Sequence, residues 1–246
     1  MEWLIGCAGF NYPQWKKVFY PDKLPQRLWL SHYATQFNTL EVNATFYKLP
    51  TPATLLKWYD TTPANFVFTV KAPRNITHYK NFINCSDEIN GFYKLIGDGL
   101  KDKLGCILFQ LPPKFSYTKE RLQLIIDNLT PQYNNVVEFR HISWWQQAII
   151  SELEGNNIIF AGHSHPNGVP DEVIINREIS YYRFHGVPNL FYSAYDEAAL
   201  MNFANTMLKC KAVTKAYVYF NNTASMAAIE NAFFLKGYLN KPGYND

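Results

Sequence analysis

The chain has 246 residues, of which 48% are hydrophobic and 17% charged, with a formal net charge of +3. This composition excludes a disordered, collagen-like or coiled-coil chain, and the length fits one large domain or two small ones. No apolar run approaches the roughly 18 residues that a transmembrane helix needs, so we expect no membrane span, and the mild charge does not by itself mark a nucleic-acid binder.

The first residues, MEWLIGCAGFNY, carry an acidic residue at once and soon reach glycine and asparagine, which is unlike a signal peptide. We therefore expect a cytoplasmic protein. The four cysteines are widely spaced and form no C-x-x-C pair. This spacing favours reduced, buried thiols over a disulfide framework or a zinc knuckle.

Short β-rich segments alternate with helix-sized segments along the whole chain. The expected strands are WLIGC, TLEVNATF, FVFTVK, CILFQL, VVEFR, IIFA, YYRFH and AYVYF, beginning near residues 3, 39, 66, 106, 136, 158, 181 and 216. Helices are expected over residues 25–37, 118–129, 144–154, 193–210 and 225–239, and two more open near residues 51 and 86.

Three of these helices have recognisable start signals. Thr51 followed by Pro52 is an N-cap with proline at the first helical position. Ser86, followed by two acidic residues, opens the next helix. Ser193 with Asp196 three residues later resembles a capping box.

Only the gap between the sixth and seventh expected strands lacks a helical pattern, because SHPNGVPDEV is rich in proline and glycine. No linker divides the chain, so we expect a single domain over residues 1–246. Eightfold strand–helix alternation predicts an α/β fold of the (β/α)8 TIM-barrel type, with the helix between strands 6 and 7 missing or very short. A doubly wound open sheet is the alternative.

Polar residues recur at every second position of these strands, although strands of a parallel barrel should be nearly all apolar. In TLEVNATFY, the alternation places Glu41, Asn43, Thr45 and Tyr47 on one face. The same pattern occurs at Thr69 with Lys71, Glu138 with Arg140, Arg183 with His185, Tyr219 with Asn221, and at Gln110. We expect these side chains to point into the barrel near the carboxyl ends of the strands.

The inward charges amount to two acidic groups against three basic ones, a net of +1 with His185 neutral: Glu41 and Glu138 against Lys71, Arg140 and Arg183. Burying an isolated charge is costly, so such groups must pair with each other or meet water and ligand. A mouth of this kind suits a small anionic or polyhydroxylated ligand. A buried ion-pair network that merely fills the barrel is the alternative.

Taken together, several segments resemble the YecE-like family, catalogued as domain of unknown function 72: IGCAGFNYPQW, FNTLEVNATFYKLP, FVFTVKAPRNITH, GCILFQLPPKF, VVEFRHISWW, YYRFHG and AYVYFNN. The resemblance covers nearly the whole chain and implies a TIM barrel, but the family carries no settled activity. The sequence departs from the pattern at Phe10, where tryptophan is expected, and near residues 162–165, where an aspartate is common.

The candidate catalytic residues are Glu41, Glu138, Lys71 and His185. Carboxylates, an amine of lowered pKa and an imidazole can all move protons, and such a lysine can also form a Schiff base or simply hold an anion. The candidate substrate-binding residues are Asn43, Tyr47, Arg74, Gln110, Arg140, Arg183 and Asn221.

Three functions remain open at this stage. The first is an enzyme that uses acid–base chemistry on a small anionic or sugar-like substrate. The second is a metal-dependent phosphodiesterase or nuclease that binds nucleic acid, and the third is a non-catalytic ligand-binding protein. No cofactor is predicted. A divalent metal held by His163, His165, His185 and a glutamate is the one exception we consider. The sequence gives no oligomeric state.

Overall fold

The computed structural model describes residues 1–166 and 168–240. Within these residues the strands are β1 (Glu2–Cys7), β2 (Thr39–Val42), β3 (Val67–Lys71), β4 (Leu104–Gln110), β5 (Asn134–Glu138), β6 (Ile158–Phe160), β7 (Gly162–Ser164), β8 (Ile179–Phe184) and β9 (Lys215–Phe220). The α-helices are α1 (Trp29–Gln36), α2 (Pro52–Thr61), α3 (Ser86–Leu100), α4 (Lys119–Asn128), α5 (Gln147–Gly155), α6 (Glu197–Lys209) and α7 (Ala227–Leu239).

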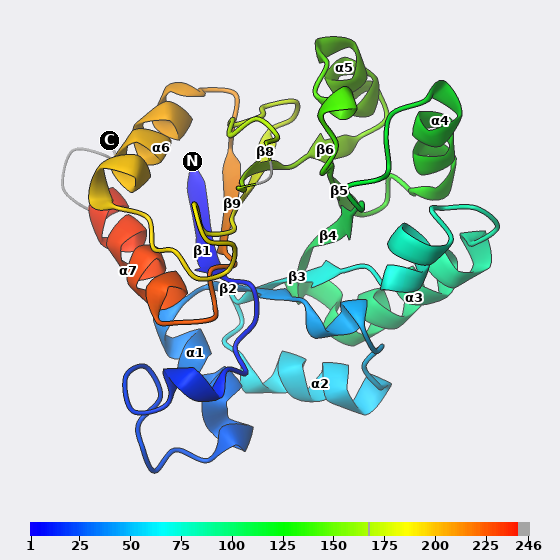
Figure 1. Cartoon of the computed structure of the whole chain (residues 1–246). Coiled ribbons are helices and arrows are strands. Elements are labelled where there is room, and N and C mark those ends of the chain that lie inside the picture. Colours follow the sequence, from blue (N-terminus) through cyan, green and yellow to red (C-terminus); the bar gives the residue numbers. More distant parts are fainter. Residues whose placement is uncertain (167, 241–246) are drawn as a thin grey trace.

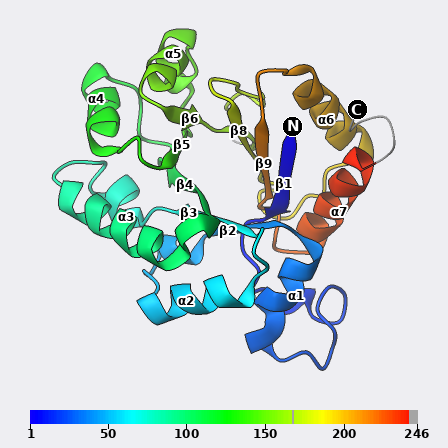
Figure 2. The ribbon, with the colours of Figure 1, turned by 180° about the vertical axis from the view of Figure 1, so that it is seen from behind.

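The strands form an α/β fold of two parallel sheets, and the helices lie outside them (Figures 1 and 2). One sheet has the order β1-β9-β8-β7 and the other the order β2-β3-β4-β5-β6. One isolated parallel bridge pairs Ala8 with Glu41 across the two sheets. The parallel α/β class is therefore confirmed, whereas the closed barrel that the sequence predicts is not shown as one continuous ladder.

The expected sixth strand, IIFA, corresponds to β6, and an additional short strand, β7, follows directly after Ala161. β6 pairs with β5, and β7 pairs with β8 of the other sheet. The amide of Ala161 still donates to the carbonyl of Val137, at 2.9 Å. The chain thus changes its hydrogen-bonding partner within one extended segment, which explains nine strands where the sequence suggests eight.

The side chain of Tyr33 bridges β1 and β2, the adjacent edges of the two sheets, and we call this junction the seam. The hydroxyl of Tyr33 accepts a hydrogen bond from the amide of Cys7, at 2.7 Å, and donates one to the carbonyl of Thr39, at 3.0 Å. A Cβ on Gly6 would lie 2.2 Å from that carbonyl oxygen, so only glycine permits this approach. A tyrosine hydroxyl therefore takes the place of a backbone hydrogen bond where a continuous ladder would close.

Two of the predicted helix starts differ in outcome. Thr51 caps α2 as expected, because its side chain accepts a hydrogen bond from the amide of Thr54. The prediction that Ser193 opens the next-to-last helix is wrong. Asp196 caps α6 instead, with its carboxylate accepting from the amide of Ala199 at 2.7 Å. The hydroxyl of Ser193 is engaged elsewhere, because it accepts a hydrogen bond from the amide of Asn189 at 3.0 Å.

Of two further starts, one is shifted and the one at Ser86 is confirmed. The helix expected over residues 144–154 begins at Gln147, because Trp144 ends a short 3-10 helix (Ile142–Trp144). Ser86 is the first residue of α3, but Cys85 occupies the capping position, without a side-chain hydrogen bond.

The connection between β7 and β8 contains no helix in its described residues, as predicted. A cavity of about 600 Å³ lies beside it, lined among others by Asp171, Tyr182 and Phe203. Across the described chain, no helix combines the length and the apolar character needed to cross a membrane.

A small buried cluster gathers side chains on the faces of the strands that point away from the helices. Its members come from both sheets: Leu4, Cys106, Leu108, Val136, Ile159, Ala161, Ile179, Tyr181, Tyr217 and Tyr219. The larger core cluster includes the neighbouring positions of the same strands, such as Ile5, Val137 and Tyr182. The two sheets therefore enclose a packed interior, and the polar site lies at the carboxyl ends of the strands around it.

Candidate functional site

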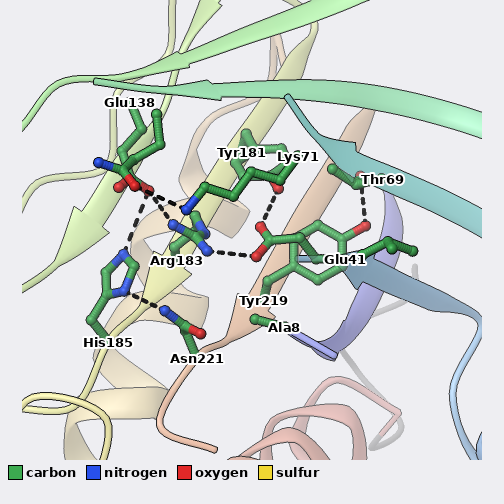
Figure 3. A network of polar contacts seen from close by, with 12 residues as sticks. Ala8, Glu41, Thr69, Lys71, Glu138, Tyr181, Arg183, His185, Tyr219 and Asn221 are labelled. Carbon is green, nitrogen blue, oxygen red and sulfur yellow. Dashed lines mark hydrogen bonds and ion pairs between the residues drawn. The ribbon is translucent and has the colours of Figure 1, made fainter. Parts of the chain in front are cut away.

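Arg183 is the centre of a buried ion-pair network (Figure 3). Its side chain is 1% exposed, and its guanidinium donates to an oxygen of Glu41 at 2.5 Å and to an oxygen of Glu138 at 2.8 Å. The hydroxyl of Tyr181 donates to the other oxygen of Glu41, at 2.5 Å. Both carboxylate oxygens of Glu41 are therefore engaged, and its side chain is fully buried.

Glu138 also contacts Arg140, whose Nε donates to the oxygen that Arg183 does not use. Burial would raise the pKa of Glu138. The positive charges of Arg140 and Arg183 outweigh that effect and hold the pKa well below the usual carboxyl value. Glu138 is thus a permanently ionised group at neutral pH.

His185 completes the buried part of the site. Its Nε2 lies 3.0 Å from an Arg140 nitrogen and 3.5 Å from Glu138, and its Nδ1 lies 2.9 Å from the Asn221 amide. Burial, and then the charge of Arg140, lower the pKa of His185 well below its usual value. The imidazole is therefore neutral at pH 7.

Lys71 ends β3 and is only partly buried. Its Nζ donates to Oε1 of Gln110 at 2.9 Å and lies 4.2 Å from the centroid of the Phe46 ring. Among the described residues, no carboxylate oxygen lies within 4.0 Å of this Nζ, so Lys71 forms no ion pair with them. Burial, and then the charge of Arg183, lower the pKa of Lys71 to about 7.

The site therefore has two layers. We call the fully buried residues Glu41, Glu138, Arg183 and His185 the floor. We call the partly accessible residues Lys71, Gln110, Arg140 and Asn221 the rim. The two carboxylates of the floor pair with Arg183 and with Arg140 of the rim, and the rim presents amine, guanidinium and amide groups at the carboxyl ends of the strands.

Three residues expected to share the strand face of Glu41 do not do so. β2 ends at Val42 and a 3-10 helix (Ala44–Phe46) follows, so the alternation breaks there and that part of the prediction is wrong. Thr45 is buried and donates to the carbonyl of Lys71 at 2.6 Å. Tyr47 is 71% exposed and stacks with Arg74, with 5.5 Å between the guanidinium and the ring centroid.

Asn43 stands just beyond β2 and is partly buried. Its amide oxygen is buried and has no hydrogen-bond partner among the described residues. Arg74 does not join the site, because it is exposed and stacks with Tyr47 and Tyr79. The other predicted residues converge as the sequence suggests, because each lies on, or one to two residues beyond, the carboxyl end of its own strand.

Sequence reasoning missed three contributors. Tyr181 shares the face of Arg183 by strand alternation, and this signal was available. Phe46 and His78 reach the site through the short helices that follow β2 and β3, and their rings pack edge-to-face at 4.9 Å. Burial, and then the charge of Lys71, lower the pKa of His78 to about 4, so this ring is also neutral.

The three histidines considered for a metal site do gather. The ring centroids are 6.1 Å apart for His163 and His165, 5.2 Å for His165 and His185, and 6.0 Å for His163 and His185. Among the described residues, however, no group of three His, Cys, Asp or Glu side chains is placed to hold a metal ion. Metal binding stays a prediction.

The fold and site define an α/β protein with a charged polar network at the carboxyl ends of its parallel strands. The chain belongs to the family described as protein of unknown function DUF72, whose model matches residues 4–245.

Two curated relatives are similar to this chain. The UPF0759 protein YecE of Escherichia coli is 26% identical over 182 residues, which cover 74% of this chain and 62% of that protein. The UPF0759 protein YunF of Bacillus subtilis is 29% identical over 148 residues, covering 57% of this chain and 51% of that protein. The matches thus span only about half to three fifths of these curated relatives.

Solved structures of the family agree in fold. A DUF72 family protein from Thermotoga maritima superposes with a TM-score of 0.89 at 26% identity, covering 98% of this chain and 100% of that one. A DUF72 family protein from Enterococcus faecalis gives a TM-score of 0.83 at 20% identity, covering 97% of this chain and 96% of that one, and this likeness concerns the fold alone.

Proposed function

We propose that this protein is an enzyme that binds a small anionic or sugar-like substrate over the rim and transforms it by acid–base chemistry. We further propose that the two sheets act as one (β/α)8 barrel. The partner exchange at Ala161 and the Tyr33 seam support this closure, because each brings the edge of one sheet against the edge of the other. The carboxyl-terminal face of such a barrel is where its enzymes place their active sites.

One observation carries the proposal. The two carboxylates of the floor are matched by two guanidinium groups, so the charge of Lys71 is left over at the accessible rim. An uncompensated cation beside a partly exposed arginine is an attractive place for an anion.

The roles follow from accessibility. Lys71 acts as the acid–base group, because an amine with a pKa of about 7 can both give and take a proton at neutral pH. Arg140 and the amides of the rim orient the substrate. Glu138 positions Arg140 and places a negative charge beside neutral His185. Glu41 positions Arg183, because both oxygens of Glu41 are already engaged.

The test measures thermal stabilisation of the protein by a panel of inorganic phosphate, sulfate, small carboxylates and sugar phosphates. A ligand present at 100 times its Kd stabilises the folded state by about 2.7 kcal/mol. We expect at least one compound to raise the unfolding temperature of the wild type but not of Lys71→Met or Arg140→Met. Lys94→Met is the matched control, because Lys94 on α3 has a side chain that is 79% exposed.

Equal shifts in all four proteins would contradict the proposal. Mass spectrometry of small molecules that co-purify with the wild type gives a second readout. A retained compound that is never turned over would indicate the non-catalytic binding function instead.

A further inference from the structure

We propose that Lys71 is a nucleophile that forms a Schiff base with a small carbonyl compound bearing an anionic group, of the 2-oxo acid class. This inference rests on the proposed function, because it uses the same rim, and it adds a covalent step and a substrate class.

The first support is the pairing of the floor. A lysine that shares a site with two glutamates normally forms an ion pair, which keeps its amine protonated and unreactive. Here Arg183 takes one oxygen of Glu41 and one of Glu138, while Arg140 takes the other oxygen of Glu138. The arginines thus withhold both carboxylates from Lys71.

The second support is the surroundings of the amine. Nζ lies over the apolar ring of Phe46 and has Gln110 as its hydrogen-bond acceptor among the described residues. Burial away from water and a neighbouring cation are two features that activate lysine nucleophiles, and here Arg183 supplies the cation. With a pKa of about 7, about half of the Lys71 amines are neutral at pH 7.

The third support is a cationic group free to receive the anionic part of the substrate. Arg140 has a side chain that is 11% exposed. Its Nε contacts Glu138 and one terminal nitrogen contacts His185. Within the described residues the other terminal nitrogen makes no hydrogen bond, so it can donate to a carboxylate. In the proposed complex this group holds the carboxylate, and the adjacent carbonyl carbon faces Lys71.

The covalent step balances without a cofactor. The lone pair of neutral Nζ attacks the carbonyl carbon, and the electrons of the C=O π bond move to oxygen, which takes a proton. The resulting carbinolamine loses one water molecule, and a C=N bond joins Lys71 to the substrate. Water supplies and accepts the protons of these steps. Hydrolysis reverses the step.

The experiment uses pyruvate as the probe and sodium cyanoborohydride to reduce any C=N bond to a stable secondary amine at pH 7. Intact-mass measurement and peptide mapping then locate the product. We expect one adduct per chain on Lys71, on the order of tenfold or more above exposed Lys94, which has the higher pKa. Lys71→Arg should abolish this adduct, and Lys94→Arg should leave it.

Arg140→Met separates recognition of the carboxylate from reactivity of the amine. It should reduce labelling by pyruvate more than labelling by acetone, a carbonyl compound without the anionic group, because the change also frees one oxygen of Glu138 beside the site. Circular dichroism and the unfolding temperature establish that each variant is folded.

Labelling spread over surface lysines, and equal in the wild type and Lys71→Arg, would overturn the Schiff base. If anions still stabilise the wild type in a Lys71-dependent way, that result removes the covalent step and leaves the acid–base function standing. If the stabilisation is also absent, both proposals fail.

Discussion

Replacing Arg183 by methionine should strongly destabilise the protein. The change removes the guanidinium that joins Glu41 to Glu138, and both carboxylates are fully buried. Breaking a buried ion pair by deleting one partner costs about 3–5 kcal/mol. For a chain of this size each kcal/mol lowers the unfolding temperature by about 2–4 °C, so the expected loss is about 6–20 °C.

The loss should depend on pH in a direction set by Glu138. In the wild type its pKa is held well below the usual carboxyl value, so its stabilisation is complete above the unfolded pKa of about 4.3 and fades as the pH falls through the folded value. Without Arg183 one opposing charge is gone, and burial raises the pKa. In the variant, protonation of Glu138 at low pH removes its unpaired buried charge. The difference in unfolding free energy between the variant and the wild type should therefore be largest near pH 7 and smaller near pH 4.

Urea unfolding monitored by tryptophan fluorescence, near pH 7 and near pH 4, measures both the loss of stability and its pH dependence. Arg183→Lys keeps the charge without the two-pronged contact and should lose less stability, which provides a folded variant if methionine is not tolerated. Arg27→Met is the control, because Arg27 is exposed. A loss below about 1 kcal/mol, as for a surface ion pair, would refute this reasoning, as would an equal loss at both pH values.

Two further predictions concern the seam between β1 and β2. Tyr33→Phe leaves the two buried backbone groups that the hydroxyl joins without a partner, so urea unfolding should show a loss of about 1–3 kcal/mol, whereas exposed Tyr47→Phe should change little. Equal effects of the two changes would speak against a bridging role for the hydroxyl. Gly6→Ala should cost about 1–3 kcal/mol or more, because the added carbon would stand 2.2 Å from a carbonyl oxygen. Gly91→Ala in α3 meets no atom within 4 Å and should instead stabilise by about 0.5–1 kcal/mol; if both alanines behave alike, the close approach is not a constraint.

Much of the fold could be predicted because strand and helix periods are local properties. The alternation in VVEFR and YYRFH correctly indicated that polar side chains share one face, and Glu138 and Arg183 do meet in the interior. The same rule failed after Val42, because alternation in a sequence continues whether or not the backbone stays extended. The turn into a 3-10 helix sends Tyr47 to the surface.

The partners within the site could not be predicted in the same way. Spacing along the chain places each charged residue at the end of its strand, but it does not state which carboxylate lies opposite which arginine. That choice depends on register between strands and on the two layers of the site. In the structure Glu41 is buried and paired with Arg183, whereas Lys71 is partly accessible and lies over Phe46. The sequence alone treats these two residues as equivalent candidates.

The most direct measurement is the titration of the Lys71 amine itself. Competitive labelling with acetic anhydride between pH 5 and pH 11, with peptide mass spectrometry as the readout, reports its degree of protonation. A buried amine beside Arg183, with no carboxylate partner, should titrate near 7, well below exposed Lys94 in the same sample. A midpoint for Lys71 near the roughly 10.4 of an ordinary lysine would mean that the amine is protonated at neutral pH, and neither the acid–base role nor the nucleophile would survive.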